Sequence, residues 1–236
     1  MIDLKSYDVI DLTNRMYHLM PGWPTHDDFI ISYLKKIAVD GYTVRKLSMN
    51  THHGTHIDTE CHMIEDGRSL DDYPLTSFMG EGVVLDLSQK DEKSEITDED
   101  LKRFSSAIGK DSIVMLHTGW YKYRKEGTKY LYNWPYVGPS AANYLVSKRI
   151  RMVGTEGLSI AGWSGKTGIA QPLTDTAISV HQILLSKGII IVEEMANLDH
   201  ILKGRETAEA FFVVLPLKIE HSDGSPVRAI AFVKRG

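Results

Sequence analysis

The chain has 236 residues, of which 42% are hydrophobic and 25% are charged, and its formal net charge is −4 at pH 7. This composition is typical of an ordinary globular protein, and it excludes both a disordered chain and a basic arm that binds polyanions. Because the chain has a single cysteine, an intrachain disulfide framework is also excluded. Its apolar runs are much shorter than the roughly 20 residues that cross a membrane, and no signal peptide is visible. We therefore expect a cytoplasmic protein with no membrane partner.

The N-terminal part is predicted to be β. A short apolar run covers residues 9–12, and two longer runs cover residues 29–37 and 42–49. The two longer runs flank Asp40-Gly41, a dipeptide that favours the positive φ angles of a tight turn. These patterns predict a β-hairpin over residues 29–49.

From residue 83 onward, short apolar runs alternate with helical patterns. Four runs rich in β-branched residues are typical of buried strands; they cover residues 83–87, 113–120, 150–157 and 188–194. Two further strands are predicted near the C-terminus, at residues 211–219 and 228–233.

Three helices are predicted between the buried strands. Thr97 and Asp100 have the spacing of a capping box before the first helix, and Ser140 can cap a second helix over residues 141–149. A third helix is predicted over residues 174–187, capped by Thr174 or Asp175 and ended by Gly188.

Strand–helix alternation predicts an α/β fold with a mixed sheet flanked by helices. The sequence shows no internal repeat and no linker rich in Pro, Gly or Ser. We therefore expect one domain over residues 1–236.

Four of the ten histidines lie within residues 51–62, THHGTHIDTECH. Every second position in this segment carries a ligand or acid–base group, apart from one glycine; these positions are His52, Gly54, His56, Asp58, Glu60 and His62. The positions between them are mostly β-branched, and such residues favour an extended chain over a helix.

A straight strand could not bring these side chains to one metal ion. At about 3.3 Å per residue, His52 and His56 would lie roughly 13 Å apart, whereas one metal ion needs donor atoms at about 2.0–2.2 Å. The chain must therefore curl, and Gly54 is the residue that permits a curl. We predict a curled segment that presents His52, His56 and Asp58 to one metal ion, the alternative being a polar surface loop.

The ligand types indicate which metals fit. Imidazole and carboxylate groups without thiolate suit Zn²⁺, Mn²⁺ or Fe²⁺. Cys61 falls on the opposite parity and is expected to be a small buried apolar residue rather than a ligand.

A second candidate pair lies downstream. His181 falls within the predicted helix 174–187, and Glu193 ends an apolar strand. A carboxylate at the end of a buried strand needs a partner, and a metal ion would serve. Each residue alone also has an ordinary interpretation, His181 as a core histidine and Glu193 as a solvated strand end.

Residues 52–62, HHGTHIDTECH, resemble the His-x-Gly-Thr-His-x-Asp-x-Pro-x-His signature of the cyclase family, which includes bacterial kynurenine formamidase, isatin hydrolase and a dienelactone hydrolase. The likeness extends to GWPTHDDF (22–29), MVGTEGLS (152–159) and the C-terminal segment 215–231. His181 and Glu193 also keep the family's twelve-residue spacing. The resemblance therefore covers nearly the whole chain.

The resemblance implies a ligand set. His52, His56 and Asp58 correspond to ligands of a first metal ion. In members that bind two ions, Asp58 would bridge to a second ion held by His181 and Glu193. The implied cofactor is one or two divalent ions per chain, zinc or manganese.

The resemblance also implies the roles of His62 and Trp23. His62 matches the family's catalytic histidine, and Trp23 matches its substrate-contacting tryptophan. The implied fold is a swivelling β/β/α-type core, and the implied assembly is a homo-oligomer, either a dimer or a tetramer.

Two departures from the family pattern concern the region around the site. Glu60 and Cys61 replace the Pro-x pair before the last histidine. Glu60 could bind metal, orient His62 through a hydrogen bond, or face solvent. Glu156 and Ala161 stand where kynurenine formamidases carry aspartates, which bears on the formamidase assignment more than on the metal site.

The implied activity is metal-assisted hydrolysis of an amide, a cyclic amide or a lactone in a small aromatic or cyclic substrate. A divalent ion lowers the pKa of water and polarises the carbonyl group. His62 would transfer the proton to the leaving group, and Trp23 would offer a flat apolar face.

A binding protein is the alternative of another class. Residues 121–136 interleave basic residues with tyrosines and Trp134, a pattern found in proteins that bind single-stranded nucleic acid. The same residue types are enriched at subunit interfaces, and the net charge is −4, so we expect no nucleic-acid partner. A metal-binding protein without activity is a further alternative.

Overall fold

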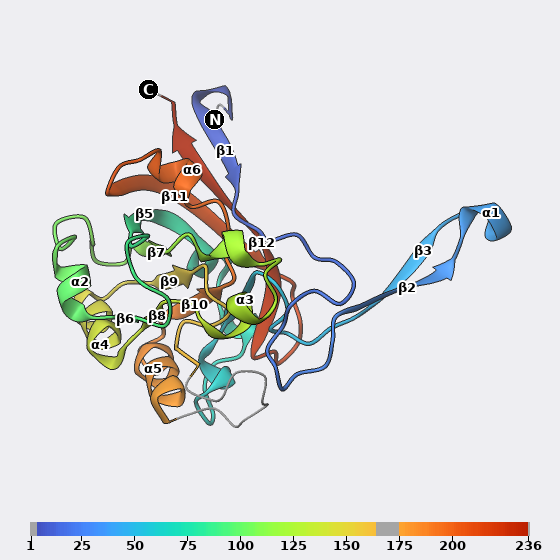
Figure 1. The fold of residues 1–236 in the computed structure, drawn as a ribbon, viewed down its shortest axis with the longest axis horizontal. Coiled ribbons are helices and arrows are strands. Elements are labelled where there is room, and N and C mark those ends of the chain that lie inside the picture. The colour runs from blue at the N-terminus through green and yellow to red at the C-terminus, as the bar shows by residue number, and fades with distance from the viewer. Residues whose placement is uncertain (1–3, 164–174, 236) are drawn as a thin grey trace.

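A mixed sheet forms the centre of this computed structural model, which describes residues 4–163 and 175–235. The strands of this sheet are β1 (Tyr7–Asp11), β4 (His56–Asp58), β5 (Met79–Asp86), β7 (Ile113–His117), β9 (Met152–Thr155), β10 (Ile190–Glu193), β11 (Thr207–Pro216) and β12 (Gly224–Lys234). They lie in the order β1-β12-β11-β5-β7-β9-β10-β4, and β4 also pairs with β12. This last pairing closes the sheet into a barrel-like core, with β1 attached outside it along β12 (Figure 1).

The four predicted buried strands form the parallel part of the barrel. β5 pairs with β7, β7 with β9, and β9 with β10, all in parallel. Parallel neighbours need crossover connections, and these contain the helices α2 (Asp98–Lys102), α4 (Pro139–Lys148) and α5 (Asp175–Leu185). The predicted α/β fold with a mixed sheet flanked by helices is confirmed.

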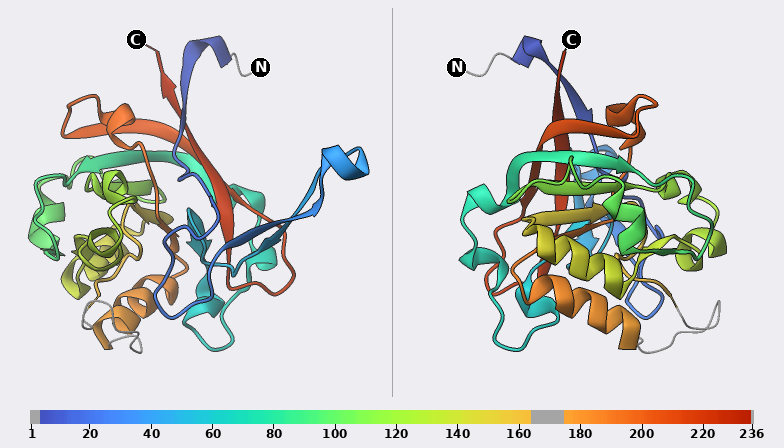
Figure 2. Two further views of the ribbon diagram at one scale, coloured as in Figure 1. Left: turned by 45° about the vertical axis from the view of Figure 1, so that its right-hand side comes forward. Right: turned by 90° about the vertical axis from the view of Figure 1, so that its left-hand side faces the viewer.

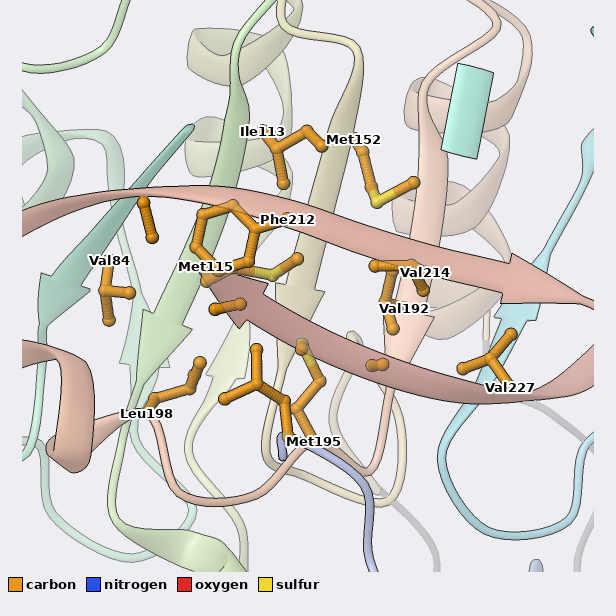
Figure 3. Packing of buried hydrophobic residues seen from close by; sticks show 14 of the residues in the cluster. Val84, Ile113, Met115, Met152, Val192, Met195, Leu198, Phe212, Val214 and Val227 are labelled. Carbon is orange, nitrogen blue, oxygen red and sulfur yellow. The ribbon is translucent and has the colours of Figure 1, made fainter. Parts of the chain in front are cut away.

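Alternate strand residues contribute to two separate hydrophobic cores, because successive side chains of a strand point to opposite faces. Val84, Met115 and Met152 point into the barrel, where Phe212 and Val214 of β11 pack against them (Figure 3). Their neighbours along the same strands belong to a second cluster, which the helices α2, α4 and α5 cover on the outside (Figure 2). The barrel is therefore a packed core rather than a channel.

The predicted start of α2 is confirmed, whereas the predicted start of α4 is not. The capping box of Thr97 and Asp100 is present at the start of α2. The predicted cap at Ser140 is wrong, because α4 begins at Pro139, two residues before the predicted start, and has Gly138 as its N-cap. Proline is well suited to that position, since it lacks the N–H that a cap would have to satisfy. The predicted cap Thr174 lies outside the described residues.

The predicted N-terminal hairpin forms, but with a different turn. Strands β2 (Ile30–Lys35) and β3 (Val44–Ser48) pair antiparallel and project away from the barrel (Figure 1). Between them lies one helical turn, α1 (Ile37–Asp40), which Gly41 ends in the left-handed conformation with φ of 77°. The Asp40 carboxylate accepts a hydrogen bond from the Lys36 N–H (2.9 Å), which favours this helical turn over the predicted two-residue turn.

Several short elements complete the described part of the chain. Strands β6 (Glu95–Ile96) and β8 (Tyr136–Val137) form a separate parallel pair. The remaining helices are α3 (Thr128–Tyr132), α6 (Asp199–Leu202) and five 3₁₀ turns at Leu4–Ser6, Glu60–His62, Leu70–Asp72, Leu75–Phe78 and Trp120–Tyr123. Within the described ranges, no helix is both long enough and apolar enough to cross a membrane.

Candidate metal centre and active site

The segment that carries the histidine cluster curls at Gly54, as predicted. Gly54 has φ of 70°, and the regular strand β4 begins only at His56. The rings of His52 and His56 consequently lie 5.1 Å apart, far closer than a straight strand would allow. The pairing of β4 with β10 then sets His56 directly opposite Glu193.

Four buried side chains converge at this point from two strands and one helix. The Nε2 atom of His56 lies 3.4 Å from Asp58 Oδ1 and 3.5 Å from Glu193 Oε2. The Nε2 atom of His181, on α5, lies 3.2 Å from Glu193 Oε1 and 3.9 Å from Asp58 Oδ2. Each of the four residues is at most 5% exposed. The structure thus brings His56 and Asp58 of the first predicted ligand set together with the second predicted pair, His181 and Glu193.

Backbone carbonyls fix the orientation of two imidazoles. The Nδ1 atoms of His56 and His181 donate hydrogen bonds to the carbonyl oxygens of Gly54 (2.7 Å) and Ala177 (2.8 Å). Since a carbonyl oxygen can only accept, Nδ1 carries the hydrogen and Nε2 of a neutral ring presents its lone pair. Each Nε2 faces a carboxylate, an arrangement that is stable with either a proton on Nε2 or a metal ion between the two groups.

His52 is held between two carboxylates. Its Nδ1 lies 2.9 Å from Asp58 Oδ1, and its Nε2 lies 2.8 Å from Asp223 Oδ2. Burial opposes the charged form of His52, but the hydrogen bonds to Asp223 and Asp58 outweigh it and raise the pKa of His52 to about 10. The hydrogen bond from His52 likewise holds the pKa of Asp223 well below its usual range. The two carboxylates therefore stabilise a positive charge on the His52 ring.

Asp58 provides the test of whether a metal ion fits. Burial opposes its ionisation, but interactions with His52 and His56 outweigh that effect and hold the pKa of Asp58 well below its usual range. Its Oδ2 atom is buried and has no hydrogen-bond partner among the described residues. A buried, ionised oxygen without a donor is costly unless a cation lies beside it. The nitrogen and oxygen donors around it fit a divalent ion of the zinc or manganese type.

Three members of the cluster, His56, His181 and Glu193, line a pocket that is open to solvent and has about 470 Å³ of space. Trp23 and His62, the predicted substrate-contacting and catalytic residues, both line this pocket. The His62 ring lies 4.1 Å from the His52 ring and 6.0 Å from the His181 ring. Trp23 packs edge-on against Trp163 at 5.3 Å and gives the pocket an aromatic surface.

Three residues near the site were not predicted from the sequence. Asp223 contacts His52, as described above; Ser159 donates a hydrogen bond to Glu193 Oε1 (3.0 Å); and His26 lines the pocket. Asp223 precedes a glycine in a loop, a pattern common to ordinary turns, so the sequence offered no specific indication of its contact. Ser159 lies in the segment 152–159 that resembles the family, but without the fold nothing connects it to Glu193.

The Glu60 side chain contacts Arg68 rather than the metal cluster. Its carboxylate accepts hydrogen bonds from the Arg68 guanidinium (2.7 and 3.1 Å) and from the Arg68 N–H (3.0 Å). The side-chain hydrogen bond from Arg68 lowers the pKa of Glu60. These contacts differ from metal binding and from orienting His62, and they favour a partly buried structural role for Glu60.

Glu156, the other acidic departure from the family pattern, is fully buried. It accepts hydrogen bonds from the N–H groups of Thr118 (3.0 Å) and Trp120 (3.2 Å) and from His117 Nδ1 (3.1 Å). These contacts connect the segment after β9 to the end of β7. Glu156, which is one methylene longer than the aspartate of the family pattern, therefore stabilises the fold.

The basic and aromatic segment 121–136 is used in packing. Tyr130 and Trp134 are at most 1% exposed. Arg124 forms a buried ion pair with Glu194, and Lys129 pairs with Glu92 at 2.8 Å. Because these aromatic faces are enclosed by the protein, they are not available for stacking with nucleic-acid bases.

Comparison with known proteins agrees with this geometry. A family model described as "Putative cyclase" matches residues 10–161. The chain belongs to this family. It is 30% identical to a kynurenine formamidase from Geobacillus thermodenitrificans over 221 residues, which are 93% of this chain and 95% of the relative.

Solved structures show the same fold. Isatin hydrolase A from Labrenzia aggregata, bound to benzyl benzoate, has a TM-score of 0.84 and 27% identity, covering 98% of this chain and 95% of its own. A "predicted metal-dependent hydrolase" from Bacillus stearothermophilus has a TM-score of 0.73 and 26% identity, covering 96% of this chain and 98% of its own. The protein is a metal-dependent hydrolase of the cyclase family, as the sequence predicted.

Proposed function

We propose that the protein hydrolyses an amide, a cyclic amide or a lactone in a small aromatic or cyclic substrate. The candidate substrates are an aryl formamide, as in the kynurenine formamidase relative, and a cyclic amide or lactone opened as in the isatin hydrolase relative. The observation that carries this proposal is the ionised Asp58 Oδ2, which has no hydrogen-bond partner among the described residues. Asp58 contacts His56 and His181, and these two histidines line a pocket together with Trp23. The site therefore offers a position for a cation beside Asp58 and, at Trp23, a flat apolar surface on which an aromatic ring can lie.

The proposed metal ligands are His52 and the four residues of the cluster. His52, His56 and Asp58 would hold a first ion, and His181 and Glu193 would hold a second ion together with Asp58. Zinc and manganese both suit this donor set. Bound there, a divalent ion lowers the pKa of water toward 7 and polarises a carbonyl group.

His62 is the proposed proton carrier. It lines the pocket beside His52, and its side chain is 21% exposed, so it can reach both the substrate and solvent. An imidazole suits the transfer of a proton to a departing amine, because its unperturbed pKa is about 6.5. Trp23 would orient the aromatic part of the substrate.

The substrate is tested by a direct comparison. We expect the protein, supplied with Zn²⁺ or Mn²⁺, to hydrolyse at least one of N-formylkynurenine, isatin and an unsaturated lactone. The ratio of kcat/KM values between the three compounds assigns the reaction class. Absence of turnover on all three, with metal bound, contradicts the proposed substrate class and favours a metal-binding protein without this activity.

The roles of ligand and proton carrier are separated by two substitutions. We predict that His62→Ala keeps the metal content of the parent while turnover falls by about 10²–10⁴-fold, because a proton carrier is lost. His56→Ala should instead lose metal, because a ligand is lost. Metal content is measured on protein prepared without chelator. A His62→Ala protein that lacks metal, or that keeps full turnover, would show that these roles are wrongly assigned.

We also propose the wider setting predicted from the sequence: one domain over residues 1–236, a cytoplasmic location, and a homo-oligomer of two or four chains. The hairpin of β2 and β3 supports the oligomer. Leu34, Ile37 and Val39 on this hairpin are 60%, 70% and 85% exposed, an unusual use of apolar side chains unless a partner covers them.

A further inference from the structure

We propose that Asp223 is a positioning residue that serves two histidines at once: it fixes the orientation of the proposed metal ligand His52 and of the proposed proton carrier His62. This inference rests on the proposed function. The Asp223 Oδ2 atom lies 2.8 Å from His52 Nε2 and 3.5 Å from His62 Nδ1. A single carboxylate oxygen therefore lies between one nitrogen of each ring.

The position of Asp223 is fixed from the backbone outward. Its carbonyl oxygen accepts hydrogen bonds from the N–H (2.9 Å) and the hydroxyl (3.0 Å) of Thr59, the residue that follows β4. The Thr51 hydroxyl donates to Asp223 Oδ1 at 2.9 Å, which leaves Oδ2 turned toward the two imidazoles. Both the backbone and the carboxylate of Asp223 are thus oriented by residues of the histidine segment itself.

The next residue, Gly224, allows this close approach. It pairs with Asp58 across β12 and β4. A Cβ atom at Gly224 would lie 2.5 Å from the Ile57 carbonyl oxygen and 3.0 Å from His52 Cε1. The absence of a side chain therefore lets the His52 ring lie against the start of β12, within reach of Asp223.

The contact determines which nitrogen of His52 faces the cluster. Asp223 holds His52 Nε2 at 2.8 Å, and with the ring in this orientation Nδ1 faces Asp58 Oδ1 at 2.9 Å. His56 and His181 present Nε2 instead, because backbone carbonyls hold their Nδ1 atoms. Without Asp223, His52 could rotate or present its other nitrogen, and either change weakens metal binding.

The test uses Asp223→Asn with Glu220→Gln as its matched control. Glu220 is an exposed carboxylate on the same loop between β11 and β12, so both changes remove one negative charge from that loop. We expect Asp223→Asn to weaken the affinity for Zn²⁺ by about 10–100-fold in competition with a chelator, and Glu220→Gln to leave it unchanged. Thr51→Val, which removes only the hydroxyl that orients Asp223, should weaken it in the same direction by a smaller factor.

A double variant isolates the action on His62. At saturating metal, Asp223→Asn should lower kcat with little change in KM. In a His62→Ala background the same substitution should lower kcat no further, while its effect on zinc affinity should persist, because that effect acts through His52. A purely structural role would instead lower kcat in both backgrounds and lower the unfolding temperature of the metal-loaded protein.

The outcomes separate this inference from the proposed function. Weaker zinc binding in Asp223→Asn supports the positioning of His52 even if the parent hydrolyses none of the three test compounds. Zinc affinity and kcat equal to those of Glu220→Gln overturn the inference even if the parent is active. An equal loss of kcat with and without His62 overturns the part that concerns His62.

Discussion

His52, His56 and Asp58 lie close together in the sequence, all at even-numbered positions. This alternation predicted that their side chains would face one site. His181 and Glu193 lie more than a hundred residues further along, and the family resemblance, rather than the pattern alone, connected them to that site. Asp223 and Ser159 were missed, because their contacts depend on strand pairings that no local pattern reports. β4 lies between β10 and β12, so residues from both neighbouring strands reach the histidines.

Glu60 carries a prediction that follows from its ion pair with Arg68. Because its contacts are to Arg68 rather than to a histidine, Glu60→Gln should leave zinc affinity far less changed than the about 10–100-fold expected when a partner of a metal ligand is removed. The free energy of unfolding should fall by less than about 1 kcal/mol, since half-exposed ion pairs contribute little.

Arg68→Gln is the matched control, because it removes the other half of the same ion pair. The two variants should show the same small loss in urea unfolding and the same unchanged zinc affinity. A tenfold weaker affinity in Glu60→Gln alone would mean that this carboxylate acts on the metal site after all.

At the scale of the elements, the patterns with a strong physical cause were predicted well. Short β-branched runs gave the four parallel strands, because strands covered on both faces must be apolar throughout. The details at element ends were predicted less well. The start of α4 depended on Pro139 rather than on Ser140, and the turn at Asp40 became helical through one side-chain hydrogen bond. Such ends depend on one or two contacts, which periodicity does not report.

Gly82 in β5 carries a prediction about the barrel. A Cβ atom there would lie 2.1 Å from the carbonyl oxygen of Ile113, its partner in the pairing of β5 with β7. The Ile113 carbonyl oxygen is a backbone atom and cannot move away by a side-chain rotation, so Gly82→Ala should force the two strands apart. We expect the free energy of unfolding to fall by at least about 1–3 kcal/mol, the usual effect of overpacking.

Gly109→Ala is the control, because a Cβ atom at Gly109 would meet no other atom within 4 Å. Urea unfolding of both variants at one fixed metal concentration gives the comparison, since bound metal itself shifts apparent stability. Equal midpoints for the two variants would mean that β5 and β7 can separate at Gly82 without a loss of stability.

At the scale of the whole molecule, the barrel brings the site together and the hairpin of β2 and β3 stands apart from it (Figures 1 and 2). A two-stranded hairpin alone is marginally stable in water, yet this one exposes every residue of β3. It carries the basic residues Lys35, Lys36, Arg45 and Lys46 and one acidic residue, Asp40, whereas the whole chain has a net charge of −4. A basic, apolar hairpin on an acidic molecule is therefore complementary in charge to a second copy of the same chain.

The proposed oligomer is tested on this hairpin. We predict that the parent has a solution mass of two or four times 26.6 kDa by light scattering. Val39→Asp combined with Ile37→Asp should lower that mass, because two carboxylates would have to be buried in the contact. Leu75→Asp is the control, since Leu75 is 68% exposed, lies outside the hairpin, and also becomes a carboxylate. A circular dichroism spectrum of the hairpin variant that matches the spectrum of the parent would establish that the variant remains folded. A parent that has the mass of one chain at micromolar concentration, or a hairpin variant that keeps the parent's mass, contradicts an oligomer held by β2 and β3.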